Sequence, residues 1–202
     1  MNDTMEIRGF TNLSALAYRL ADTFANSPSH MASPLAYPYA AVIMAITFVD
    51  SYFSEQIAIF AGEESEVAEG KAKFTHQQAD ELKGRNIERK LDEFLAAFGR
   101  SWNKGCEPYQ SFKQILTLRH QLVHYKPKFQ PITDFPNPTI EQIAQRFPHP
   151  YLGRTPWSAT VLTPQVAAWA CKTAKELVRE FHSITGTTSP WETGMPGWED
   201  HP

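Results

Sequence analysis

Three residues near the middle of the chain, Arg119, His120 and His124, have the side chains that metal-independent cleavage of RNA needs. Such cleavage requires a base that takes the ribose 2′-OH proton and an acid that protonates the leaving 5′-oxygen. Histidine suits both roles, since the residue type titrates near neutrality. The charge that develops on phosphorus needs a cation, and arginine binds two phosphate oxygens with its planar fork. The three residues therefore indicate phosphodiester chemistry.

A broadly apolar helix is predicted to carry these residues and to end before Pro127. Its apolar side chains fill more than half of a helical wheel, so we expect a central helix packed on several sides. They are Tyr109, Phe112, Ile115, Leu116, Leu118, Leu122 and Val123. Arg119 falls inside this apolar arc, where an unpaired charge is costly. Asp50, in the middle of another long apolar helix, is the expected ion-pair partner of Arg119.

Helical geometry limits what one copy of this helix can do. Arg119 and His124, five residues apart, are separated by about 140° and do not share a face. His120 and His124, four apart, do share one. A structural role is open for each residue: Arg119 as a core arginine neutralised by Asp50, His124 as a C-terminal helix cap, and His120 as an orienting or surface group. The first role is compatible with function.

Arg119, His120 and His124 resemble the R-x4-6-H signature of HEPN domains, compact α-helical bundles of many prokaryotic toxins and RNA-cleaving enzymes. Asp50 matches a looser family tendency for an acidic residue on the second helix. The resemblance implies a homodimer in which two signature helices form one cleft. It implies a metal-independent endoribonuclease of defence or growth control, without cofactor, and an antitoxin protein as a further candidate partner. The alternative functions are a non-catalytic dimeric module that binds RNA, a nucleotide or a protein, and a purely structural helical module.

The fold expected from periodicity is all-α, a bundle of about five helices in one domain over residues 1–185. Residues 186–202, rich in Pro, Gly and acid, are predicted to form a C-terminal tail that is either flexible or lightly docked. Residues 63–84 are predicted to form an acidic, solvent-exposed excursion that can be partly helical. The segment 126–163 is proline-rich and irregular, with only 139–146 able to form a helix of any length. Both segments exceed what a minimal HEPN domain needs, so substrate access cannot be taken from the family.

Charge is unevenly distributed along the chain. The net charge is −3, yet between Lys83 and Lys128 basic residues outnumber acidic ones ten to four. An anionic ligand fits this part of the chain, although charge runs are often plain solvated surface. Lys113, Lys126 and Lys128 are candidates for phosphate contacts. Tyr125 can stack on a base, or Tyr125 and Lys126 can simply close the helix end.

Other kinds of site lack support in the sequence. Glycine-rich phosphate loops, H-E-x-x-H, C-x-x-C and nucleophile-elbow motifs are all missing, and no third ligand accompanies the His120/His124 pair. We therefore predict no metal and no cofactor. The longest apolar run, 40–49, is shorter than a bilayer span, and no leader pattern opens the sequence. A soluble, cytoplasmic protein is the resulting expectation.

Overall fold

The computed structural model describes residues 13–26, 35–62, 76–124, 134–148, 156–193 and 198. Every regular element in these ranges is an α-helix, which confirms the all-α prediction. The helices are α1 (Leu13–Asn26), α2 (Ala36–Gly62), α3 (His76–Lys83), α4 (Ile87–Ala96), α5 (Tyr109–Val123), α6 (Pro138–Arg146), α7 (Trp157–Val161) and α8 (Pro164–Thr185). The described ranges thus hold eight helices rather than about five. The additional ones, α3, α6 and α7, are short and lie in the two segments predicted to be mainly irregular.

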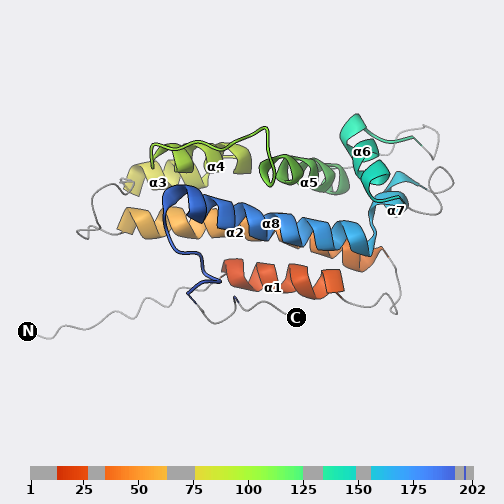
Figure 1. Cartoon of the computed structure of the whole chain (residues 1–202), viewed down its shortest axis with the longest axis horizontal. Coiled ribbons are helices and arrows are strands. Elements are labelled where there is room, and N and C mark those ends of the chain that lie inside the picture. The colour runs from red at the N-terminus through yellow and green to blue at the C-terminus, as the bar shows by residue number, and fades with distance from the viewer. Residues whose placement is uncertain are drawn as a thin grey trace, which may run out of the picture.

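The long helix α2 is the centre of the bundle. Its apolar side chains point in almost every direction, and α1, α3, α4, α5 and α8 all contact it. Val42, Phe48, Val49 and Phe53 have no exposed surface. Figure 1 shows α2 and α8 side by side in a middle layer, with α1 on one side and α3, α4 and α5 on the other. A helix that is apolar all round has to be covered on several sides, as this one is.

An aromatic cluster joins α2, α4 and α8. The rings of Phe94 and Phe181 stack with centroids 5.2 Å apart, and Phe53 meets Phe181 edge-on at 5.1 Å. Phe60 and Phe98 continue the cluster. Large buried rings dominate core energetics, so this cluster fixes α4 against the two middle helices.

Local capping explains where α4 begins and where α8 begins and ends. The Asn86 side chain accepts a hydrogen bond from the backbone N–H of Arg89 at the start of α4. Thr163 caps α8 in the same way, with Pro164 at the first helical position. Gly186 ends α8 with a positive φ of 67°, the left-handed conformation that glycine adopts without strain. These three signals are local, because each depends only on residues within one turn of the helix end.

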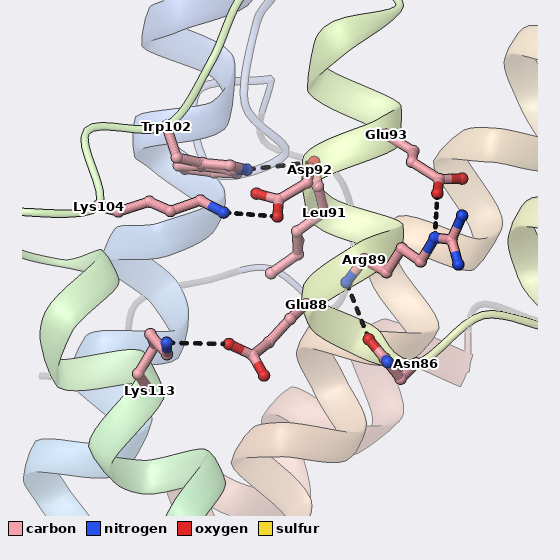
Figure 2. Close-up of polar contacts among 9 residues, drawn as sticks. All are labelled: Asn86, Glu88, Arg89, Leu91, Asp92, Glu93, Trp102, Lys104 and Lys113. Atoms are coloured by element: carbon pink, nitrogen blue, oxygen red, sulfur yellow. Dashed lines mark hydrogen bonds and ion pairs between the residues drawn. The ribbon is translucent and has the colours of Figure 1, made fainter.

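The connection between α4 and α5 folds back over α4. Trp102 Nε1 donates a hydrogen bond of 3.1 Å to the Leu91 carbonyl, and Lys104 Nζ lies 2.6 Å from Asp92 Oδ2. Figure 2 shows both contacts, together with an ion pair between Lys113 on α5 and Glu88 on α4. The return of the chain places the first turn of α4 next to the middle of α5.

After residue 185, the part of the chain that the structure describes is docked on the bundle, which is the second of the two predicted alternatives. Trp198 is only 3% exposed. Its ring stacks on that of Tyr18 at 6.1 Å and meets Tyr52 edge-on at 5.8 Å, while Trp191 packs against Tyr18 at 5.3 Å. The composition around these tryptophans is typical of disorder, but two indoles bury enough apolar surface to dock the segment on α1 and α2.

One helix, α2, is long and apolar enough to cross a bilayer by length and composition alone. This test tolerates charged residues within the helix, whereas the expectation above concerned the uninterrupted apolar run 40–49, which is shorter. The central helix of a bundle passes the same test, and five other helices contact α2 here. The cytoplasmic location stays a prediction.

Candidate functional site

Helix α5 presents one buried face and one accessible face. Tyr109, Phe112, Ile115 and Leu118 are buried, and the helix contacts α2, α6 and α8. Helix α5 is therefore packed as predicted on this face, but it is not covered on several sides. The other face carries the signature residues, and Val123 at its end is 42% exposed. The helix ends at His124, whose backbone N–H donates a hydrogen bond of 2.9 Å to the His120 carbonyl.

The expected ion pair between Asp50 and Arg119 is not formed. Asp50 Oδ1 lies 2.5 Å from Lys90 Nζ, which also donates a hydrogen bond of 2.8 Å to Ser54 Oγ. The Lys90 side chain is 3% exposed, whereas that of Asp50 is 51% exposed. Arg119 is only partly buried, so water can solvate its guanidinium. The deeply buried charge that needs a carboxylate is Lys90.

A signal for Lys90 was present in the sequence. Ile87, Leu91 and Phe94 form the apolar stripe of α4, and Lys90 falls within that stripe at position i+3 from Ile87. A lysine at such a position needs either a buried partner or a route for its ammonium group to reach water. Lys90 thus carries the same signal as Arg119, a charged side chain within the apolar stripe of a helix.

Asp50 and Arg119 nevertheless face the same space. A cavity of about 570 Å³ lies between the middle of α2, the start of α4 and the middle of α5. Its lining is mixed, with charged, polar and apolar side chains. The lining residues are Ile46, Thr47, Asp50, Arg85, Asn86, Ile87, Glu88, Lys113, Leu116, Thr117, Arg119 and His120. Arg85 and Asn86 were not foreseen, because their distance from the signature in the chain hides their proximity in space.

The two signature histidines lie together at the end of α5. Their ring centroids are 4.8 Å apart with planes inclined at 50°, and both side chains are exposed. The prediction that they share a face is confirmed. His120 also lines the cavity, whereas His124 is not among its lining residues. Arg119 and His120 thus connect the cavity with the exposed histidine pair.

The remaining predicted site residues divide into two groups. Lys113 lines the cavity, but its ammonium lies 3.4 Å from Glu88 Oε1 and is partly neutralised. Tyr125, Lys126 and Lys128 lie outside the described residues. Within the described ranges, no cluster of three or more His, Cys, Asp or Glu side chains could hold a metal ion.

A second histidine environment lies away from the signature residues. His182 on α8 is buried, and its ring nitrogens contact the Tyr52 hydroxyl and, at 2.6 Å, the Thr187 hydroxyl. Burial lowers the pKa of His182 to about 4, although Glu192 acts in the opposite direction. Burial likewise raises the pKa of Tyr52. At neutral pH this group is a neutral structural network.

Neither cysteine is a candidate nucleophile. Burial raises the pKa of the Cys171 thiol to about 12, with a smaller contribution from Asp22, so the thiolate is scarce at neutral pH. Cys106 is exposed in the connection before α5 and does not line the cavity.

No protein-family model, curated protein or solved structure matches this chain. The likeness to HEPN domains consequently depends on the signature residues and on an all-helical bundle in which they lie at the accessible end of one helix.

Proposed function

We propose that the protein is a metal-independent endoribonuclease of HEPN type, with Arg119, His120 and His124 as its catalytic residues. The observation that supports this proposal best is their common location at the accessible end of α5. The histidine rings are 4.8 Å apart, and Arg119 and His120 open onto one cavity. Proton transfer by imidazole and charge stabilisation by guanidinium are the functions that this chemistry requires.

The chemistry calls for two copies of α5. In phosphoryl transfer the attacking and leaving oxygens lie roughly in line, on opposite sides of phosphorus. His120 and His124 share one face of one helix, so they approach the phosphate from the same side. A base and an acid on opposite sides would come from two chains. We therefore propose a homodimer that pairs the α5 ends, where Val123 and His124 are exposed. Cellular defence or growth control and an antitoxin partner follow from the resemblance alone.

A second candidate function is a dimeric module that binds RNA or a nucleotide without cleaving it. One observation favours it. The cavity of about 570 Å³ lies beside the signature residues, and His124 does not line it. A ligand held there would contact Arg119 and His120 but would not require His124.

The two functions are separated by a cleavage assay on purified protein. We expect the wild type to cut single-stranded RNA in EDTA and to leave 2′,3′-cyclic phosphate ends. His124→Ala should lower the rate by about 10²–10⁴-fold, as expected for loss of a general acid or base. The fold should survive, because the imidazole is exposed. Gln110→Ala, an exposed change at the opposite end of α5, is the matched control and should cleave normally.

Three results would contradict this proposal. A wild type that binds RNA but never cuts it would favour the binding module. Full activity in His124→Ala would remove the assigned role of that residue. Sedimentation that shows a fully active monomer at micromolar concentration would refute the two-chain arrangement.

A further inference from the structure

We propose that the cavity between α2, α4 and α5 is a nucleotide-binding subsite that holds one nucleotide unit of an RNA chain. Arg85 and Arg119 bind its phosphate, and the apolar wall of the cavity takes its base. The placement of this nucleotide next to the cleaved bond rests on the proposed ribonuclease function, whereas nucleotide binding itself does not. Arg85 and Asn86 are the new binding residues.

The charges around the cavity leave two cations available. Lys113 pairs with Glu88, and Asp50 pairs with Lys90. Within the described part of the chain, the guanidinium groups of Arg85 and Arg119 make no hydrogen bond or ion pair. The phosphodiester of an RNA chain carries one negative charge shared by two non-bridging oxygens, and each oxygen can accept hydrogen bonds from one guanidinium group. Arginine also binds phosphate oxygens in a two-pronged manner that lysine cannot reproduce.

The start of α4 adds donors to the same place. Asn86 Oδ1 is occupied as the helix cap by the N–H of Arg89, at 2.9 Å. The Nδ2 amide of Asn86 is thus the group that remains to donate to a ligand. Asn86, Ile87 and Glu88 all line the cavity, so the positive end of the α4 dipole faces it as well. Figure 2 shows Asn86 and Glu88 at this end of α4, with Lys113 across from Glu88.

The remaining lining suits a planar base. Ile46, Ile87 and Leu116 supply apolar surface from three different helices. The hydroxyls of Thr47 and Thr117 donate to backbone carbonyls of their own helices, at 3.0 and 2.9 Å. Because each hydroxyl hydrogen is used in such a bond, either oxygen can interact with a ligand only as an acceptor, which amino groups on a base can use.

Size and position agree with this assignment. A cavity of about 570 Å³ lies in the range that small-molecule sites occupy. Arg119 and His120 belong both to this cavity and to the proposed catalytic group. A nucleotide bound in the cavity therefore continues into an RNA chain that passes the histidine pair.

The binding experiment uses adenosine 5′-monophosphate, with adenosine and inorganic phosphate as partial ligands, in calorimetric titrations of the full chain. We expect the complete nucleotide to bind more tightly than either part. Arg85→Ala and Arg119→Ala should each weaken its binding by about 10–100-fold, the effect of losing a charged hydrogen bond. Arg100→Ala, an exposed arginine at the other end of α4, is the matched control and should bind normally. Amide NMR signals of Thr47, Asn86 and Thr117 should shift on titration.

The subsite is refuted if adenosine 5′-monophosphate does not bind, or if both arginine variants bind it as well as Arg100→Ala does. Binding of a 12-nucleotide RNA to the His124→Ala variant tests the subsite without cleavage of the RNA. Weaker RNA binding on adding Arg85→Ala supports the subsite, and unchanged RNA binding overturns it. If nucleotide and RNA binding depend on Arg85 but wild type cuts no RNA, only the ribonuclease proposal fails. If His124→Ala abolishes cleavage while Arg85→Ala leaves KM unchanged, only the subsite fails.

Discussion

Asp50→Ala tests how the structure neutralises its most deeply buried charge. Removing one partner of a fully buried ion pair destabilises a protein by about 3–5 kcal/mol. Here the remaining Lys90 ammonium would keep its 2.8 Å hydrogen bond to Ser54 Oγ, and the Asp50 side is half open to water. We therefore expect a loss of about 2 kcal/mol in the free energy of unfolding. Lys90→Met should cost less than about 1 kcal/mol, because Asp50 can be solvated and methionine fills the apolar stem region.

Urea unfolding at neutral pH, followed by circular dichroism, measures these changes. A double-mutant cycle between Asp50→Ala and Lys90→Met should give a coupling of about 1–2 kcal/mol, and one between Asp50→Ala and Arg119→Ala less than about 0.5 kcal/mol. Asp92→Ala, which breaks the exposed pair with Lys104, is the control and should cost no more than about 1 kcal/mol. A neutral Asp50→Ala, or a stronger coupling to Arg119 than to Lys90, would refute the assigned ion pair.

Two further predictions concern His182 on α8 and Trp198 in the docked C-terminal segment. Because burial holds the pKa of His182 near 4, below its ordinary 6.5, the unfolded chain takes up a proton first as pH falls. The contribution of His182 to the free energy of unfolding should be nearly constant above pH 6.5 and should fall by about 3 kcal/mol towards pH 4. His182→Asn should remove that part of the decline, and an equal decline in the wild type and the variant would refute the assignment. Trp198→Ala should cost about 3 kcal/mol in urea unfolding, since its indole contacts Tyr18 and Tyr52, whereas a mobile tail would give no change.

The helices were largely predictable from the sequence because their signals are local. Apolar side chains recur at helical spacing in α1, α2, α4, α5 and α8, and Thr163 and Gly186 are typical of the start and the end of a helix such as α8. A periodic stripe and a cap depend on residues within a few positions of each other, so no knowledge of packing is needed. Short helices such as α7 lack a full period of the pattern, and the prolines around them concealed them.

The candidate site was predictable only in part. Residue types and spacing along one helix were sufficient to select Arg119, His120 and His124 and to place the two imidazoles on one face. The sequence alone thus determined an all-helical chain and the order of Arg119, His120 and His124 along one helix.

Only the tertiary structure decided what surrounds those residues. It pairs Asp50 with Lys90, 40 positions away, assembles the cavity from α2, α4 and α5, and docks Trp198 against Tyr18. Each of these outcomes depends on which helices pack together and at what rotation about their axes. Many pairings satisfy the same apolar stripes, and the one adopted is set by the fit of large side chains such as Phe53, Phe94 and Phe181 in the core.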